Sequence, residues 1–306
     1  MSQLIETHEA ATADEFIDSL RKSDDNWWDT KKGVQRWVFR GLGTTKYSLT
    51  PSSRRPIENN PLRKLIERNG DSADPQAWCE AEKWSVNEFV NIASLQGLET
   101  HTVTTVKQRL GIVTGNNTVP DVLKAQHHGI PTQFLDWTFD PKIAIHFAAT
   151  SAATHVRARR GECLVGPPEE LKLCVWAFDR YTEFVDLFVE SIGGNSLAGA
   201  GFYLEYDEPS QNHYLRLQEG MFVGLSCADI FFKKIGRWPS MEDYCDLNFI
   251  RGAKNGKVIL KKFVLSETQL PRLLEILQRE GIMRSTIMPT LDNVAKDVLD
   301  RIQRFG

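Results

Sequence analysis

Apolar residues recur at helical spacing through most of the first 130 positions. Thr12 precedes one such segment, and Asn59 and Asp74 precede two more. Side chains of this kind accept hydrogen bonds from the free N–H groups of a first helical turn. The pattern therefore predicts a helical N-terminal region over about residues 1–128.

Stretches rich in β-branched and aromatic residues dominate the middle of the chain and predict a strand-rich core over about 129–265. Helical patterns return in a C-terminal region, 266–306. Helices and strands thus occupy separate stretches, which argues for an α+β domain with mixed or antiparallel sheets rather than a repeating βαβ barrel. We expect one domain that spans residues 1–306. The strands predicted in the core are at 171–178, 202–206, 214–217, 221–225 and 258–265.

The junction between the helical region and the core carries the most informative local pattern. Residues 130–137 alternate as a strand does, Asp140 then occupies an N-cap position, and Pro141 occupies the first helical position. Ile143 and Phe147 follow on one helical face, which we predict to be buried. A strand–turn–helix corner of this kind presents N–H groups and short polar side chains that can hold an anionic ligand.

Composition adds limits on the class of partner. The chain has 306 residues, of which 41% are hydrophobic and 25% charged, as in an ordinary globular protein with a buried core. A formal net charge of −3 gives no overall attraction to nucleic acid. Local basic clusters are expected at the surface, either solvated or as docking sites for phosphates. They are residues 154–161 in a predicted loop, Arg54 with Arg55, and Lys233 and Lys234 with Arg237.

Several classes of site are not predicted. Five scattered cysteines without a CxxC pair indicate neither a disulfide framework nor a structural zinc site. His127 and His128 have no spaced partner, so we predict no metal. The motifs GxxxxGK[ST], HExxH and GxSxG are absent, and the glycine-rich segment 193–201, which lacks a P-loop lysine, predicts a loop. The acidic N-terminus is not a signal peptide and no stretch is long enough to cross a membrane, so we expect a cytoplasmic protein.

Four segments, in order, resemble the FRG domain, which is named for a Phe-Arg-Gly motif. Here that motif is Phe39, Arg40 and Gly41, at the end of a short strand predicted from Arg36. The segment QHHGIPTQFLDWT, residues 126–138, resembles the central motif of the family. Two later segments, 215–222 and 281–296, resemble its Arg…Gln-x-Gly-x-Phe strand and its C-terminal part. We therefore interpret the chain as a single FRG-type domain.

The order of these segments is also similar to that in toxin-like ADP-ribosyltransferases. Those enzymes carry an Arg on a first strand, then a strand followed by a helix, and a catalytic Glu on a later strand. The resemblance implies an ADP-ribosyltransferase-like fold and NAD as the substrate. It assigns catalysis to Arg40, Gln218 and Glu219. It assigns NAD binding to Phe39, Arg40, Gly41, Asp136, Trp137, Thr138 and Phe222.

The residues leave two structural alternatives open. Asp136 could simply form a salt bridge with Arg40 rather than contact a ligand. Strand alternation turns only one of Gln218 and Glu219 toward a pocket, and both the alternation and the family resemblance favour Gln218 unless Gly220 forms a bulge.

The implied biological role is an intracellular toxin or anti-phage defence effector. It would modify an RNA or a protein acceptor and would be silenced by an antitoxin or another inhibitor protein. The alternative is a non-catalytic module that binds a nucleotide or an RNA end through Arg40 and residues 136–138. A nuclease built on Asp136, Glu205 and Asp207 would depend on Mg²⁺.

Overall fold

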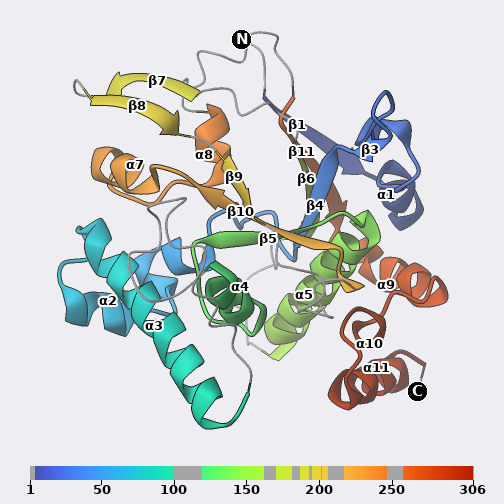
Figure 1. Ribbon diagram of the computed structural model, residues 1–306. Helices are drawn as coiled ribbons and strands as arrows, with labels where there is room; N and C mark the ends of the chain where they lie inside the picture. Colours follow the sequence, from blue (N-terminus) through green and yellow to red (C-terminus); the bar gives the residue numbers. More distant parts are fainter. Residues whose placement is uncertain are drawn as a thin grey trace.

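The computed structural model shows a mixed seven-stranded sheet surrounded by helices (Figure 1). It describes residues 4–98, 119–161, 170–180, 187–192, 195–200, 202–205, 217–246 and 258–305. β1 and β11 pair in parallel and the other neighbours are antiparallel, so the predicted α+β class is confirmed. In sheet order the strands are β1 (Ile5–Ala10), β11 (Leu260–Ser266), β6 (Lys172–Asp179), β4 (Trp37–Leu42), β5 (Phe134–Thr138), β10 (Gly220–Leu225) and β9 (Phe202–Glu205).

Helices and short ribbons complete the described part of the chain. The α-helices are α1 (Ala13–Ser19), α2 (Arg63–Asn69), α3 (Pro75–Leu95), α4 (Val119–His127), α5 (Pro141–Gly161), α7 (Ala228–Ile235), α8 (Met241–Asp246), α9 (Leu270–Arg279), α10 (Arg284–Ile287) and α11 (Leu291–Phe305). The 3-10 helices are η1 (Asp25–Trp27), η2 (Ser52–Arg54), η3 (Ile57–Asn59) and η4 (Glu267–Gln269). Two separate ribbons pair β2 (Trp28–Asp29) with β3 (Val34–Gln35) and β7 (Leu187–Ile192) with β8 (Asn195–Ala200).

The sheet is split between its two central strands. Every residue of β4 pairs with β6, whereas on its other side only Phe39 pairs with β5, at Thr138. Figure 1 shows the consequence, because β4 and β6 run down the view while β5 and β10 run across it. Beyond the Phe39–Thr138 pair, side chains rather than backbone hydrogen bonds must fill the space between β4 and β5.

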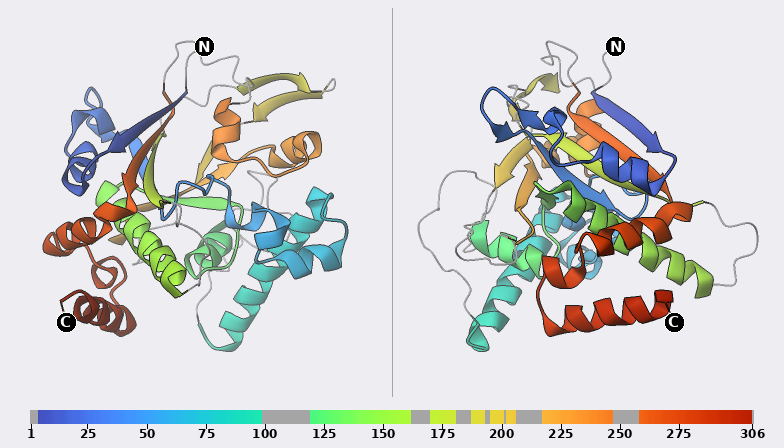
Figure 2. Two further views of the ribbon diagram at one scale, coloured as in Figure 1. Left: turned by 180° about the vertical axis from the view of Figure 1, so that it is seen from behind. Right: turned by 90° about the vertical axis from the view of Figure 1, so that its right-hand side faces the viewer.

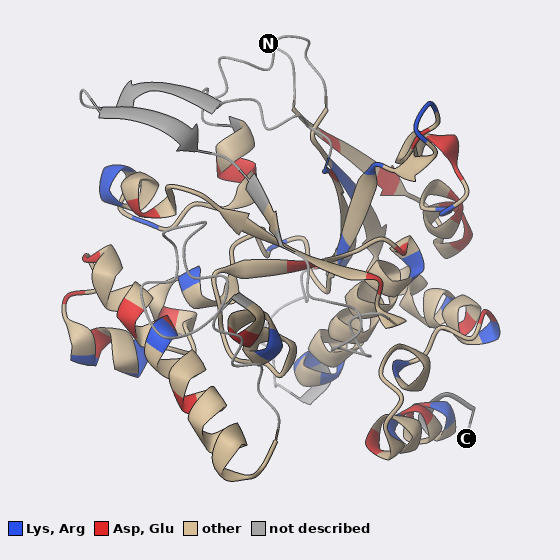
Figure 3. Ribbon diagram, in the orientation of Figure 1, with Lys and Arg blue, Asp and Glu red and all other residues tan. Residues whose placement is uncertain are grey.

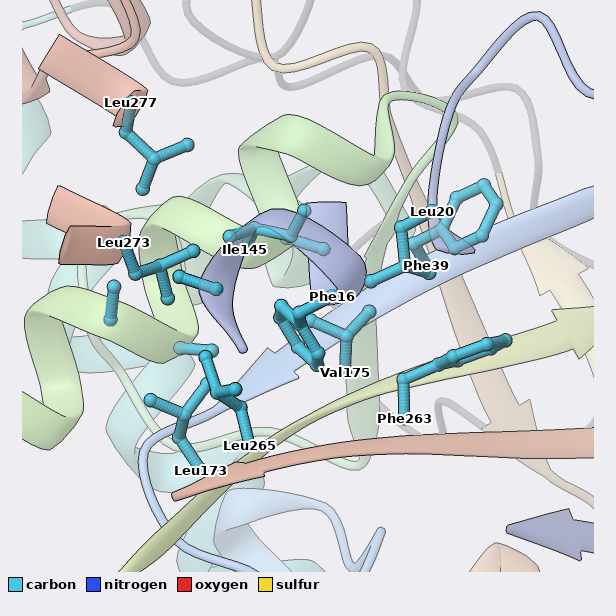
Figure 4. Close-up of a cluster of buried hydrophobic side chains, with 14 of the residues drawn as sticks. Phe16, Leu20, Phe39, Ile145, Leu173, Val175, Phe263, Leu265, Leu273 and Leu277 are labelled. Atoms are coloured by element: carbon cyan, nitrogen blue, oxygen red, sulfur yellow. The ribbon is translucent and has the colours of Figure 1, made fainter. Parts of the chain in front are cut away.

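Strand β4 packs against α5 at very short range. Trp37 and Phe39 are buried on the face toward α1, α5 and α9, in the cluster drawn in Figure 4. Gly41 continues that face, and a Cβ atom there would lie 1.9 Å from the backbone oxygen of Ala144 and 2.7 Å from the backbone nitrogen of Ala148. Alanines at the facing positions of α5 are likewise fully buried. Only a strand residue without a side chain permits this approach, which is why Gly follows Arg in the motif.

Local capping signals confirm three predicted helix starts. Thr12 Oγ1 accepts a hydrogen bond from the N–H of Glu15, and Asp74 Oδ1 accepts one from Gln76. Asp140 Oδ1 accepts from the N–H of Lys142 at 2.8 Å, directly after Pro141 enters α5. Each carboxylate or hydroxyl therefore satisfies a donor that the helix cannot satisfy internally.

Several predictions were wrong. Residues 5–10 form β1 rather than part of a helical region, because they pair with the distant strand β11. The predicted loop at 193–201 contains β8, which pairs with β7, and the predicted loop at 154–161 is the end of α5. Phe147 is 41% exposed rather than core, while Ile143 is buried as predicted.

Helices α3 and α4 cover the other half of the sheet. Val86 of α3 and Val122 and Leu123 of α4 form one cluster with Phe134 of β5 and Phe222 of β10. The opposite face of the sheet packs against α7 and α8. On the side of α5 and α4 the split between β4 and β5 therefore lies between two separately packed clusters, whereas on the opposite face Val38 of β4 and Leu135 of β5 belong to one cluster.

The C-terminal helix α11 is oriented with its polar side inward. Asp300 forms ion pairs with Arg157 and Arg284, and Asp297 accepts a hydrogen bond from the N–H of Ser285. The apolar side chains of α11 face solvent instead. Figure 2 shows that α11 lies farther from the sheet than α5 and α9 do. The exposed apolar residues of α11 are Leu291, Val294, Val298, Leu299 and Ile302.

Within the described ranges, no helix combines the length and apolarity required to cross a membrane. Basic and acidic positions are interspersed along the same helices, for example α3 and α11 (Figure 3). This distribution accords with the small net charge of the whole chain.

Replacing Gly41 with Ala should destabilise the protein by about 3 kcal/mol or more, because the added methyl group overlaps the backbone of α5 and forces β4 and α5 apart. Urea denaturation would measure the loss in the free energy of unfolding. Gly129→Ala is the matched control, because Gly129 has a positive φ of 90° but open space around it. It should cost only the backbone strain, about 1–2 kcal/mol. Equal losses at the two sites would contradict the close-contact argument.

Candidate functional site

Arg40 extends from β4 into the split of the sheet. Its side chain is 16% exposed, and Nη1 donates to the backbone oxygen of Asp136 at 2.6 Å. The same Nη1 lies 3.5 Å from Asp136 Oδ2. Its Nε is buried and, among the described residues, has no hydrogen-bond acceptor. A buried guanidinium with an unused donor is costly to fold, because a lost hydrogen bond of a charged group is not replaced by water.

A second guanidinium adds to the positive charge at this point. Burial lowers the pKa of Arg40 from its ordinary value, the charge of Asp136 opposes that shift, and the nearby charge of Arg55 adds to it. Arginine nonetheless remains protonated near neutral pH. Arg55 is exposed, and its side chain makes no ion pair or hydrogen bond within the described part of the chain. Two guanidinium groups with unused donors thus lie close enough to interact electrostatically, and such groups bind phosphates and carboxylates.

A buried ion pair fixes the segment that carries Arg55. Arg54 Nη1 lies 2.9 Å from Glu82 Oε2 of α3, and the guanidinium stacks 4.5 Å from the centre of the Trp238 ring. Glu82 also accepts hydrogen bonds from Ser53 Oγ and from the N–H of Gln133, both at 2.9 Å. The prediction that Arg54 belongs to a surface cluster was thus wrong, because its charge is neutralised in the core.

Asp136 supplies the carboxylate next to Arg40. It is 61% exposed, although its neighbours Leu135 and Trp137 on β5 are buried. Its Oδ1 accepts a hydrogen bond from Nε2 of Gln126 on α4. The salt bridge with Arg40, which the sequence left as an alternative to ligand binding, is present. Together, Arg40, Asp136, Gln126 and the nearby Arg55 form the candidate site.

The aromatic residues and the glycine that the sequence assigned to NAD binding lie in the core. Phe39 is fully buried against α5, and Trp137 packs 5.6 Å from Phe178 on the opposite face. Phe222 is 1% exposed, beneath α3 and α4. Gly41 is in contact with α5. These residues therefore shape the strands that carry the candidate site, and none of their side chains has a surface open to a ligand.

Thr138 connects three elements. Its hydroxyl donates to the backbone oxygen of Gln218 at 2.6 Å and accepts from the N–H of Asp140 at 3.0 Å. The side chain is 6% exposed. Thr138 thus ties the end of β5 to the turn before β10 and to the start of α5.

Gln218 and Glu219 lie in that turn and not on a strand, because β10 begins at Gly220. Glu219 has a φ of 45°, so the expected alternation of the two side chains does not apply. Its carboxylate is 43% exposed and forms an ion pair with Lys22 Nζ at 2.6 Å, and that ammonium lies 3.6 Å from Asp140. The structure therefore pairs Glu219 with Lys22, whereas Arg40 is paired with Asp136.

Residues 35–157 match the family model of the FRG domain. The chain carries an FRG domain. The match contains the Phe39–Gly41 motif and residues 126–138, so the resemblance seen in the sequence is confirmed for these two segments. The segments 215–222 and 281–296 lie outside it. No curated protein and no solved structure matches the chain significantly.

The candidate site falls entirely within the matched range of the FRG domain. Sequence reasoning identified Arg40 and Asp136 but gave no role to Gln126 or Arg55 individually. Gln126 is the first residue of the central motif, ten residues before Asp136, which is the signal that could have indicated its role. No group of three or more His, Cys, Asp or Glu side chains suited to a metal ion occurs among the residues that the structure describes.

Arg40 and Arg54 should differ in how much stability is lost when their charge is removed. Arg40→Met should change the free energy of unfolding by less than about 1 kcal/mol, because it leaves Asp136 largely solvated and removes an unsatisfied buried donor. Arg54→Met should cost about 3–5 kcal/mol, because it leaves Glu82 buried without its cation. Chemical denaturation of both variants would measure this difference. A loss for Arg40→Met as large as that for Arg54→Met would make Arg40 a structural residue.

Proposed function

We propose that the FRG domain of this chain is an NAD-dependent ADP-ribosyltransferase whose phosphate-binding group is Arg40. The observation that supports this function best is Arg40 at the split of the sheet, with an unused donor, an adjacent carboxylate and the positive charge of Arg55 nearby. A pyrophosphate offers two negative groups, and guanidinium groups bind such groups through paired hydrogen bonds. The ADP-ribosyltransferase-like fold type belongs to the same proposal and is supported by the order of the motifs along the chain.

The carboxylate assigned to the reaction in this proposal is Asp136. Cleavage of the nicotinamide–ribose bond passes through a cationic, oxocarbenium-like sugar, which a nearby carboxylate stabilises. Glu219 is neutralised by Lys22, whereas Asp136 is exposed and adjacent to Arg40. The geometry therefore favours Asp136 over the residue that the toxin-like motif order suggested.

The transfer balances without a further reactant. The bond from C1′ of the ribose to the ring nitrogen of nicotinamide breaks, and its electron pair leaves with neutral nicotinamide. An oxygen or nitrogen of the acceptor forms the new bond to C1′ and loses a proton. An RNA or a protein can supply this acceptor. The action as a toxin or phage-defence effector, held inactive by an inhibitor protein, belongs to the same proposal.

A second candidate function is nucleotide binding without turnover. The Lys22–Glu219 ion pair favours it, because it neutralises the carboxylate at the position in the chain where the toxin-like enzymes carry their catalytic Glu. The hydroxyl of Thr138 is also engaged by the backbone on both sides. In that case Arg40 and Arg55 would bind the phosphates and no nicotinamide would be released.

Calorimetry with ADP-ribose, together with release of labelled nicotinamide from NAD in cell lysate, would test these functions. Arg40→Met should weaken ADP-ribose binding about 10- to 100-fold, since a charged hydrogen bond contributes about 1.5–3 kcal/mol. Arg55→Met should weaken binding by a smaller factor because Arg55 is exposed. Arg63→Met is the control, since Arg63 is exposed and already paired with Glu67.

Nicotinamide release that disappears in Arg40→Met would support the transferase. ADP-ribose binding without any release would replace it with the binding module. Unchanged ADP-ribose affinity in Arg40→Met would remove the proposed site from both functions.

A further inference from the structure

Hydrogen bonds of the Gln126 side chain join the start of the central FRG motif, residues 126–138, to three later positions in the same motif. Gln126, at the end of α4, donates from Nε2 to the backbone oxygen of Phe134 at 3.3 Å and to Asp136 Oδ1. Its Oε1 accepts from the hydroxyl of Thr132, which is fully buried. The turn that ends α4 at Gly129 folds the chain back, so that residues 126, 132, 134 and 136 meet.

The partners of the Gln126 amide fix its orientation. A carboxamide has two N–H donors and one oxygen acceptor. Two acceptors, the Phe134 carbonyl and the Asp136 carboxylate, take the N–H groups, and the Thr132 hydroxyl supplies the donor for the oxygen. A flipped amide would place its oxygen against two acceptors, and a Glu at this position would place a carboxylate against another. No other side chain of similar length satisfies all three partners.

The hydrogen bonds hold an exposed carboxylate in one direction. An exposed Asp on a strand is ordinarily free to change rotamer, and Asp136 is 61% exposed. Here Gln126 holds Oδ1 while Arg40 lies 3.5 Å from Oδ2. Glu82 provides a separate attachment, through the N–H of Gln133, between α3 and the start of the same strand. The carboxylate is thus oriented before any ligand binds, which lowers the entropy that is lost when it is held in position against a ligand.

We propose that Gln126, buttressed by Thr132, is a positioning residue that holds the Asp136 carboxylate for the ribosyl-transfer step. This inference rests on the proposed transferase function. As the C1′–nitrogen bond breaks and nicotinamide leaves with the electron pair, the oriented carboxylate faces the cationic ribose. The acceptor then bonds to C1′, and its proton passes to Asp136 and from there to water. Gln126 touches neither the ribose nor the acceptor.

The test separates the rate of transfer from ligand affinity. Gln126→Met removes both ends of the hydrogen-bond chain at nearly constant length and should lower kcat for nicotinamide release about 10- to 100-fold, as small misplacements of reacting groups do. Affinity for ADP-ribose should change less than about twofold, because Arg40 and Arg55 are intact. Gln133→Met is the matched control. Gln133 is the neighbouring glutamine; its backbone N–H donates to Glu82, and its side chain makes no hydrogen bond to any residue that the structure describes, so kcat should stay unchanged.

Thr132 provides the conservative rescue. Thr132→Val removes the hydroxyl that orients the Gln126 amide and should lower kcat, as Gln126→Met does. Thr132→Ser keeps the hydroxyl and should have a kcat near that of the wild type. Thermal unfolding of all variants would show whether the fold is retained. A merely structural role would make kcat follow stability and would leave Ser and Val equally poor.

Three outcomes decide between the inference and the function on which it rests. Loss of kcat at unchanged ADP-ribose affinity in Gln126→Met supports the positioning role. Unchanged kcat in a folded Gln126→Met overturns the positioning role and leaves the transferase function standing. A wild-type protein that releases no nicotinamide overturns the transferase function, and the inference with it.

Discussion

The contact between β4 and α5 is the constraint on which the other features depend. Gly41 brings the strand so close to the helix backbone that no side chain fits between them. This contact fixes the side of β4 on which Phe39 is buried, and alternation then turns Arg40 away from α5 toward the split in the sheet. Because α5 begins at Pro141, three residues after β5 ends, the same contact also fixes the start of the helix relative to Thr138 and Asp140.

The chemistry of the candidate site follows from unequal neutralisation of its charges. Arg54 and Glu82 neutralise each other in the core, and Lys22 neutralises Glu219 at the surface. Among the described residues, Arg40 has only the partial compensation of one carboxylate at 3.5 Å and one carbonyl, with Arg55 adding a second positive charge. The candidate site therefore carries more positive than negative charge, although the chain as a whole is slightly acidic.

Local patterns in the sequence predicted the local structure well. Caps at Thr12, Asp74 and Asp140 mark helix starts because each depends on residues within one turn. The α+β class and the strand of the Phe-Arg-Gly motif were likewise accessible. By contrast, β1 depends on a partner some 250 positions later, and no local pattern reports that pairing.

The arrangement of the candidate site could be predicted from the sequence only in part, because it depends on contacts between distant segments of the chain. Arg40 and Asp136 were identified from the motifs, but their contact depends on how far β4 and β5 diverge after one pair. The turn at Gln218 and Glu219 was predicted as a strand, because a single residue with φ of 45° breaks the alternation without changing the composition. Trp137 and Phe222 were expected to face a ligand, whereas cluster packing on both faces of the sheet buries them.

The single backbone pair between β4 and β5 also has a mechanical consequence. Adjacent strands joined along their length resist shear through many hydrogen bonds, whereas β4 and β5 share one residue pair, the Arg40 hydrogen bond and, on one face of the sheet only, a common hydrophobic cluster. The split is thus the junction with the fewest backbone pairs between neighbouring strands of this sheet. A ligand bound to Arg40 on β4 and to Asp136 on β5 would bridge the split. Ligand binding and the rigidity of the sheet would therefore increase together.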